Sequence, residues 1–319
     1  MDAPSPTPAT PVHLRWGVEA LRVQLQPLLP GIEIEVIPRL DSTNTRLLER
    51  ARLAGGDRDA LITGPGDLDA ASRGTPSTPL ERRTADLVPG LLVAEEQTAG
   101  RGRLGRGWNS APGRSLTFSL GLPMAPAQWG GLSLAVGVAL AQALEPEPAT
   151  PRLLLKWPND LWLLDAATPA GGRKLGGVLI ETVAVGRHRR VVVGVGLNVL
   201  PLPPDADAAP ALAHGYASLH EIDAAASAPK VLATVALPLA RALRRFEHEG
   251  FGPFAAGYAA RDLLQGRAVA VQGAVPLEGT AEGVDAQGAL RVRTADRMHL
   301  VVGGEASVRA VPPSPGLAA

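Results

Sequence analysis

Four short segments of this sequence contain glycines, polar or charged side chains that could contact a ligand, or both. They are residues 100–108 (GRGRLGRGW), 156–160 (KWPND), 173–178 (RKLGGV) and 193–198 (VGVGLN). Arginine and lysine donate hydrogen bonds to phosphate and carboxylate oxygens, and glycine lets a ligand approach the backbone closely. The combination indicates chemistry on a phosphorylated or carboxylated substrate.

Residues 100–108 contain the pattern G-x-G-x-x-G after an apolar strand, which is the dinucleotide-binding fingerprint. That motif needs a helix directly after it to hold the pyrophosphate, whereas residues 108–113 and then a strand follow here. The remaining interpretation is a flexible loop whose arginines close over a phosphate or carboxylate. Taken alone, the segment fits a solvated basic turn or an RGG-like nucleic-acid contact better.

Residues 156–160 place an amide and a carboxylate beside a lysine at the end of an apolar strand, where active sites of α/β proteins gather. Asn159 and Asp160 could orient a ribose or bind Mg²⁺, and Lys156 could offset phosphoryl charge. The alternative is an ordinary Asn-Asp turn.

The last two segments place glycines inside strands. Lys174 precedes Gly176 and Gly177, so its ammonium group could enter a site and stabilise charge on a reacting phosphate; a lysine at a hairpin edge is the alternative. Gly194 and Gly196 remove side chains from one face of a strand, which leaves room for a ligand or marks a β-bulge.

The elements that must position these segments follow from hydrophobic periodicity. A strand over 31–37 leads through Asp41-Ser42-Thr43 into a capped helix that ends at Gly55-Gly56. The remaining predicted elements are the strands LLVAEE, SLTFSLGLP, LLLKWPND, KLGGVLIETVAV and RRVVVGVGLNV, and the helices GLSLAVGVALAQAL, 230–248 with a bend at Pro238, and 251–264.

Changes in hydrophobic periodicity and in turn residues along the sequence divide the chain into regions. After Gly266, short strand-like pieces alternate with turns, which predicts a small β-barrel of about five strands. We expect a partly disordered leader at 1–30, a catalytic domain at 31–265, the barrel at 266–312 and a tail at 313–319. Residues 64–89 lack any period and are expected to form a mobile insertion.

Composition excludes several classes of function. The 319 residues contain 31 Lys plus Arg and 31 Asp plus Glu, so the net charge gives no general attraction to nucleic acid or membranes. Cysteine is absent, which excludes disulfides, thiolate metal sites and a cysteine nucleophile. No apolar run reaches about 18 residues and the N-terminus does not read as a secretory signal, so we expect a cytoplasmic protein.

The four segments, in this order, with DSTN at 41–44 and EQTA at 96–99, resemble the biotin-protein ligase family over roughly residues 32–311. The combination is far more specific than any single motif. The resemblance implies an α/β (α+β) catalytic domain with a mixed sheet, similar to class II aminoacyl-tRNA synthetases, followed by an SH3-like barrel.

The resemblance also implies the reaction. Biotin is activated with ATP and Mg²⁺ to biotinyl-5′-AMP and then transferred to a lysine of the biotin carboxyl carrier protein of a biotin-dependent carboxylase. The alternatives are a lipoate-protein ligase and a non-catalytic biotin-binding regulator. Only about thirty residues precede the first predicted strand, so we expect no N-terminal DNA-binding domain, no nucleic-acid partner, and a monomer or weak homodimer.

The resemblance also implies roles for individual residues, and several residues are expected to have more than one role. Lys174, Arg101, Lys156 and Asp160 are expected to act in catalysis, with Asp160 also a candidate metal ligand. Biotin is expected to contact Ser42, Thr43, Asn44, Gln97, Arg101, Gly102, Arg103, Lys174, Gly177, Gly194 and Gly196. The nucleotide is expected to contact Arg103, Arg106, Trp108, Asn159, Lys174 and Asn198. Residues 100–107 would close over the reactive intermediate and exclude water.

Overall fold

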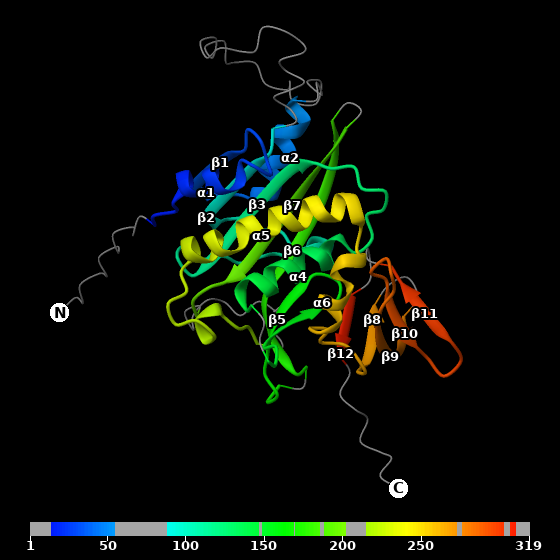
Figure 1. Ribbon diagram of the computed structural model, residues 1–319. Helices are drawn as coiled ribbons and strands as arrows, with labels where there is room; N and C mark the ends of the chain where they lie inside the picture. Colours follow the sequence, from blue (N-terminus) through cyan, green and yellow to red (C-terminus); the bar gives the residue numbers. More distant parts are fainter. Residues whose placement is uncertain are drawn as a thin grey trace, which may run out of the picture.

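The computed structural model describes residues 14–54, 88–146, 149–168, 170–185, 188–201, 215–272, 276–302 and 307–310. Its larger part is built on a seven-stranded sheet in the order β1-β2-β3-β7-β6-β5-β4 (Figure 1). The strands are β1 (Glu33–Leu40), β2 (Gly90–Gln97), β3 (Ser115–Pro123), β4 (Leu153–Lys156), β5 (Asp160–Leu164), β6 (Gly172–Val185) and β7 (His188–Asn198). Among these strands β1 and β2 pair in parallel and the other neighbours pair antiparallel, so the sheet is mixed, as predicted.

One strand was missed by the sequence prediction. The pattern LLLKWPND reads as a single strand, whereas the structure has β4 before residues 157–159 and β5 after them, paired as an antiparallel hairpin. The peptide bond between Trp157 and Pro158 is cis. The segment KWPND is therefore the tip of a hairpin, and Asp160 opens a strand that supports the site.

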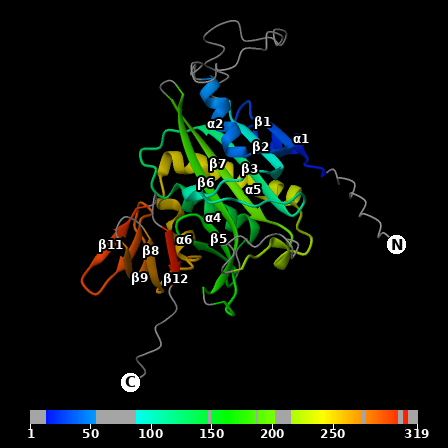
Figure 2. The ribbon, with the colours of Figure 1, turned by 180° about the vertical axis from the view of Figure 1, so that it is seen from behind.

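Helices cover the two faces of the sheet unequally. In front of the sheet in Figure 1 lie α4 (Leu132–Leu144) and α5 (Ala228–Glu249), and α1 (Val18–Leu25) packs against α5. The other face, seen in Figure 2, carries α2 (Thr43–Ala54). Apolar residues of α5 recur at helical spacing, with Leu232, Val235, Leu239 and Leu243 all buried. Pro238 lies within this helix, and the bend predicted there stays a prediction.

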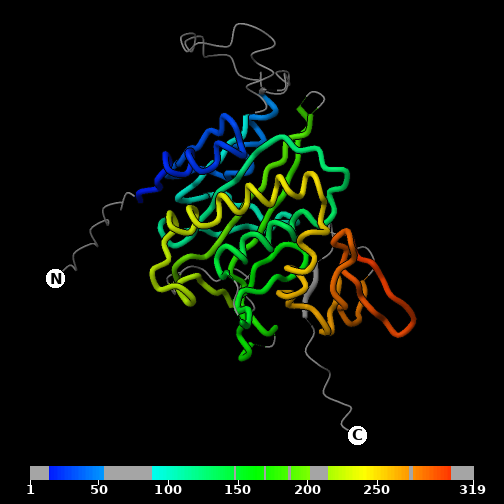
Figure 3. The backbone as a smooth tube through the Cα atoms, in the orientation of Figure 1, coloured from blue at the N-terminus to red at the C-terminus, as the bar shows by residue number. Residues whose placement is uncertain are grey.

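The C-terminal part forms a separate antiparallel sheet in the order β11-β10-β9-β8-β12, beside the larger part in Figure 3. Its strands are β8 (Ala268–Gln272), β9 (Leu277–Val284), β10 (Leu290–Arg293), β11 (Met298–Val301) and β12 (Ser307–Ala310). The short elements η4 (Leu219–Glu221), η5 (Gly252–Phe254) and α6 (Ala255–Ala259) flank α5 and lead to this sheet.

A single apolar core joins the two parts. Buried residues of α4, α5 and the central strands cluster with Val269, Ala281 and Val292 of the C-terminal sheet. Trp157 is buried among them and donates its indole N–H to the Gly288 carbonyl at 3.0 Å. The tip of the β4–β5 hairpin is therefore fixed by the second sheet.

Parts of the predictions fall outside the described residues. These are residues 1–13 of the leader, the helix stop at 55–56, most of the insertion at 64–89 and the tail with the last residues of the barrel, from 311 onward. Within the described ranges, no helix combines the length and apolarity needed to cross a membrane.

Candidate active site

A row of paired residues crosses four antiparallel pairings of the large sheet. Thr117 pairs with Gly196, Gly196 with Gly177, Gly177 with Asp160, and Asp160 with Lys156. Directly paired residues project from the same face of a sheet. Three of the four predicted segments therefore meet on one face, in a row with two glycines at its centre.

Side chains from other elements fill two of the glycine positions. A Cβ atom on Gly196 would lie 2.5 Å from the Trp108 ring, and one on Gly194 would lie 2.2 Å from Asn44 Oδ1. The two glycines therefore make room for protein side chains in this structure. Gly177 differs, because its nearest neighbours would be Asp160 Oδ1 at 3.3 Å and Lys174 Nζ at 3.7 Å.

The N-terminus of α2 forms one end of the site. Ser42, Thr43 and Asn44 are each only 3% exposed. The Thr43 N–H, one of the groups that a helix start leaves without an intrahelical acceptor, donates to Gln97 Oε1 at 2.7 Å. Ser119 Oγ lies 2.6 Å from both Thr43 Oγ1 and Asn44 Oδ1. This end is a group of uncharged polar side chains, buried except for the partly exposed Gln97, which we call the polar pocket: Ser42, Thr43, Asn44, Gln97 and Ser119.

Asn44 is held on every side. Its amide nitrogen donates to Glu181 Oε2 at 2.9 Å and to the Leu179 carbonyl at 3.2 Å, while its oxygen faces Ser119. An amide has two N–H donors and one acceptor oxygen, so these contacts use its full set of donors. Asn44 therefore fixes the polar pocket to β3 and β6.

Residues 100–108, which we call the flap, form a closed hairpin. Arg101 and Gly107 pair as an antiparallel bridge, and the Gly102 N–H donates to the Arg106 carbonyl at 2.7 Å. Leu104 at its tip has a φ of 57°, a left-handed conformation that costs a non-glycine residue roughly 1–2 kcal/mol. The flap is thus an ordered turn over the sheet.

The base and the tip of the flap contact opposite ends of the site. Arg101 Nη2 donates to Glu181 Oε1 at 2.8 Å, near the polar pocket. Arg103 Nη1 donates to Asn159 Oδ1 at 3.3 Å, beside the β4–β5 hairpin. Arg101 and Arg103, both expected to contact biotin, therefore contact protein groups in different parts of the site, and their expected contacts with biotin stay predictions.

The other end of the site, which we call the charged end, is built on Lys174 and Asp160. Lys174 Nζ donates to Asp160 Oδ1 at 2.8 Å. Asn159 is fixed to β6 because its Nδ2 donates to the Val178 carbonyl at 2.8 Å. Burial lowers the pKa of Arg103, Asp160 opposes that shift and Arg106 adds to it. The cations gathered here suit an anionic substrate.

The side chain of Lys156 extends along the sheet toward the neighbouring strand β5. Its ammonium group lies 4.5 Å from the centre of the Trp162 ring, a cation–π contact, and Trp162 pairs with Lys174 on the next strand. Lys156 therefore belongs to the border of the charged end.

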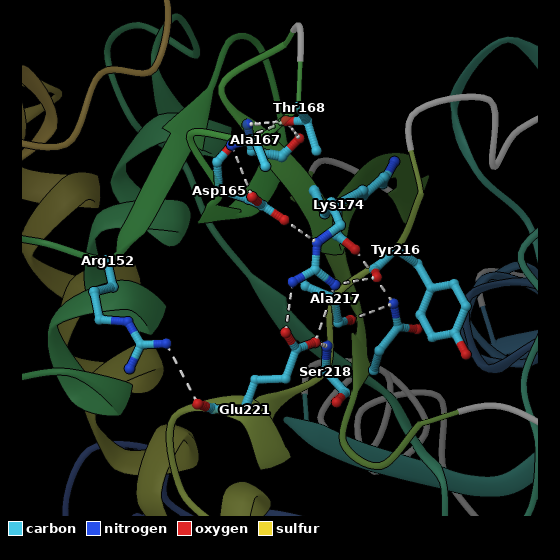
Figure 4. A network of polar contacts seen from close by, with 12 residues as sticks. Arg152, Asp165, Ala167, Thr168, Lys174, Tyr216, Ala217, Ser218 and Glu221 are labelled. Atoms are coloured by element: carbon cyan, nitrogen blue, oxygen red, sulfur yellow. Dashed lines mark hydrogen bonds and ion pairs between the residues drawn. The ribbon is translucent and has the colours of Figure 1, made fainter.

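The main chain of Lys174 is fixed by a polar network that the sequence analysis did not predict (Figure 4). Arg173 donates to Asp165 Oδ2 at 2.7 Å, to Glu221 Oε2 at 2.6 Å and to the Tyr216 carbonyl at 2.8 Å. These hydrogen bonds lower the pKa of Asp165 and raise that of Arg173. Burial raises the pKa of Glu221, but the hydrogen bonds from Arg173 and the Ser218 N–H lower it overall.

Asn198 takes part in the same network. Its Nδ2 donates to the Ala217 carbonyl at 3.1 Å and lies 3.5 Å from the Lys174 carbonyl, and the Ala217 N–H donates to that same Lys174 carbonyl at 2.8 Å. In this structure Asn198 supports the backbone beneath Lys174, and its expected contact with a nucleotide stays a prediction.

The structure adds three residues that were not among the expected site residues: Ser119, Glu181 and Arg173, the last of which begins the predicted segment 173–178. Ser115, Thr117 and Ser119 alternate with apolar residues in β3, so one polar face was detectable. Glu181 is an acidic residue in an apolar strand, but its partners come from residues 44 and 101 and no local pattern predicts them.

Two family models match the chain. The model described as the biotin/lipoate A/B protein ligase family matches residues 79–198, and the biotin protein ligase C terminal domain matches residues 265–309. The first covers β2, the flap, the β4–β5 hairpin and the β6–β7 pair. The second coincides with the C-terminal sheet.

Individual relatives agree over most of the chain. The biotin--[acetyl-CoA-carboxylase] ligase of Mycobacterium tuberculosis is 35% identical over 281 residues, which cover 86% of this chain and 88% of the relative. The bifunctional ligase/repressor BirA of Salmonella typhimurium is 32% identical, covering 92% of this chain and 78% of the relative. Among solved structures, the biotin protein ligase from Aquifex aeolicus in complex with biotin and ATP matches with a TM-score of 0.63 and 25% identity, covering 88% of this chain and 99% of that chain.

Proposed function

Because the chain belongs to the biotin protein ligase family, it is a ligase that uses biotin and ATP, and we propose how its residues divide the two half-reactions. In the first, the biotin carboxylate attacks the α-phosphate of ATP, the bond to the β-phosphate breaks, and pyrophosphate leaves. In the second, the acceptor lysine attacks the acyl carbon of biotinyl-5′-AMP, and AMP leaves. The acceptor is a biotin carboxyl carrier protein.

The polar pocket is proposed to bind the ureido ring of biotin. A urea offers two N–H donors and one carbonyl acceptor without charge, and the pocket is uncharged and rich in hydroxyl and amide groups. Thr43, Gln97 and Ser119 face one another there at 2.6 to 3.1 Å. Asn44 and Gly194 act behind them, holding the pocket in shape.

The charged end is proposed to hold the reacting groups. Lys174 stabilises the charge that develops between the biotin carboxylate and the α-phosphate, and Arg103 reaches the phosphate from the flap. Asp160 orients Lys174 and is the candidate base for the acceptor amine. The contact that carries this proposal is the 2.8 Å pair of Lys174 and Asp160 beside Gly177, which has no side chain to cover the pair.

Mg²⁺ fits this end as an ion carried by ATP. The described residues contain no cluster of three or more metal-ligating His, Asp or Glu side chains, and Mg²⁺ in nucleotide sites commonly uses one or two carboxylates plus phosphates. Asp160 is the carboxylate placed to contribute. When bound, Mg²⁺ offsets the charge of the departing pyrophosphate.

The flap is proposed to protect the mixed anhydride from water, with Trp108 covering the nucleotide side. We also propose that the protein acts in the cytoplasm, where ATP is supplied, as a monomer or weak homodimer.

The test is a mass measurement of a biotin carrier domain incubated with the full chain, ATP, Mg²⁺ and biotin, with lipoate in a parallel reaction. An ATP-dependent mass increase of one biotinyl group is expected. Modification with lipoate alone would move the chain to the lipoate ligases. Biotin binding without any modification would leave a non-catalytic regulator.

A further inference from the structure

Glu181 joins three elements of the site through one carboxylate. Its Oε2 accepts from Asn44 of α2 at 2.9 Å, and its Oε1 accepts from Arg101 of the flap at 2.8 Å. Glu181 itself lies on β6. Its side chain is 22% exposed and that of Arg101 is 47% exposed, so solvent reaches the ion pair from the flap side.

Arg101 makes its second contact on the same side. Its Nη1 donates to Thr45 Oγ1 at 3.2 Å, so the guanidinium group bridges β6 and the first turn of α2. The backbone of Arg101 pairs with Gly107 across the flap hairpin. Holding this guanidinium group therefore holds one leg of the hairpin.

The position of Glu181 on β6 separates it from the reacting groups. Lys174 Nζ lies 3.7 Å from where a Cβ atom on Gly177 would be, and Glu181 follows Gly177 by four positions along the strand, which corresponds to about 13 Å at roughly 3.3 Å per residue. The carboxylate lies instead where Asn44 closes the polar pocket. At that distance Glu181 can hold the flap but cannot take part in bond formation at the charged end.

We propose that Glu181 is a positioning residue that anchors the flap through Arg101 and so sets how long biotinyl-5′-AMP is retained before the acceptor arrives. This inference rests on the proposed function. Because the flap has separate contacts at Arg101 and Arg103, loss of one weakens closure without removing the cover. A partly exposed ion pair is worth up to about fivefold in an equilibrium, which is the expected scale of the effect.

Glu181→Gln tests the anchor, because glutamine removes the negative charge and replaces one acceptor oxygen with a donor. The matched control is Glu282→Gln, which breaks the 2.6 Å pair of Glu282 and Arg293 in the C-terminal sheet, with similar side-chain exposures of 31% and 53%. Urea unfolding of each variant establishes that it is folded under the assay conditions.

The first measurement is the rate of trypsin cleavage within the flap, after Arg101, Arg103 and Arg106, followed by mass spectrometry on the unliganded full chain. Glu181→Gln is expected to raise this rate about fivefold, and Glu282→Gln to leave it unchanged. A wild-type rate in Glu181→Gln, or an equal rise in both variants, would overturn the anchor. If Glu181→Gln does not fold, Arg101→Gln breaks the same pair without touching Asn44, and the rate of cleavage after Arg103 and Arg106 then decides in the same way.

The second measurement is the release of AMP with biotin and ATP but no acceptor. Glu181→Gln is expected to release AMP about fivefold faster than wild type, with the release rate of each protein divided by its own single-turnover rate of biotinyl-5′-AMP formation. Unchanged release despite a cleavable flap would refute the retention role. A wild-type chain that consumes no ATP would instead refute the proposed function, and the trypsin result would still stand as the test of the anchor.

Discussion

The polar pocket and the charged end are built in opposite ways. The pocket is buried and uncharged, and its groups hydrogen-bond to one another, with Thr43, Asn44 and Ser119 each at most 3% exposed. The charged end is partly open, with Lys174 at 36% and Asp160 at 21% side-chain exposure. A neutral ring can be recognised by a prebuilt surface, whereas reacting anions need charges that can exchange one partner for another.

Removing the central cation should break the charged end most severely. Lys174→Ala is expected to slow formation of biotinyl-5′-AMP by about 10²- to 10³-fold, the usual cost of losing one group that stabilises developing charge. Biotin affinity should stay within a few-fold, because the polar pocket is untouched. Rapid-quench single-turnover assays measure the first quantity and calorimetry the second. Wild-type adenylation in this variant would remove Lys174 from the mechanism.

Replacing a glycine at each end with alanine should have different effects on biotin affinity at the two ends. Gly194→Ala places a Cβ atom 2.2 Å from Asn44 Oδ1 and is expected to weaken biotin binding about 30-fold, or about 2 kcal/mol, since Asn44 must leave its partners. Gly177→Ala is the matched control at the charged end, where the nearest atom is 3.3 Å away. It should leave biotin affinity within threefold. Equal losses in both variants, measured by calorimetry, would contradict the division.

Loss of the hydrogen bond between Trp157 and Gly288 should weaken ATP use at the charged end and leave biotin affinity unchanged. Trp157→Phe removes the N–H donor and leaves a buried carbonyl without its partner, at a cost of about 1–3 kcal/mol in the free energy of unfolding. The KM for ATP is expected to rise about threefold with biotin affinity unchanged, because Trp157 adjoins Asn159 and Asp160. Urea denaturation and steady-state kinetics measure these changes. A rise in the KM for biotin of equal size would argue for a general loss of structure.

The smallest expected effect is the pH dependence of the stability that Arg173 contributes. The pKa values of Asp165 and Glu221 are lowered in the folded protein, so their pairing with Arg173 stabilises the fold above their unfolded pKa values. That contribution is lost as the pH falls through the lowered values, when both carboxylates become protonated. The stability difference between wild type and Arg173→Met should therefore be full at pH 6 and shrink as the pH falls below about 4. Urea midpoints across this range give the difference, and a constant gap would exclude these two carboxylates as its source.

The sequence predicts those parts of this molecule that are determined locally. Runs of apolar residues predict the strands that carry Lys174 and the glycines, and the Asp-Ser-Thr cap predicts the start of α2, whereas the mixed sheet was expected from the family resemblance. The hairpin at 156–160 was missed because apolar runs on both sides of a Trp-Pro pair fit one longer strand as well as two short ones.

Long-range pairing explains the remaining differences. Gly194 and Gly196 are recognisable as gaps in a strand, but what fills them depends on residues 44 and 108, which only the folded chain brings there. Arg101 and Arg103 are two positions apart in sequence and contact residues 22 positions apart on β6 and the β4–β5 hairpin, at 181 and 159. No local pattern could assign the two arginines to different ends.

The row from Thr117 through Gly196 and Gly177 to Asp160 has a consequence for protein engineering. The site depends on the alignment of four strands. A residue inserted into or deleted from β5, β6 or β7 would shift the strand register and turn the following side chains to the opposite face of the sheet. Inserting one residue into β7 before Val193 would exchange the faces of the residues that follow it and bring the Val193 and Val195 side chains to the positions of Gly194 and Gly196, which Asn44 and Trp108 now fill. Grafting this site onto another scaffold would therefore require its strand register to be transferred intact, while the identity of most surface residues could be chosen freely.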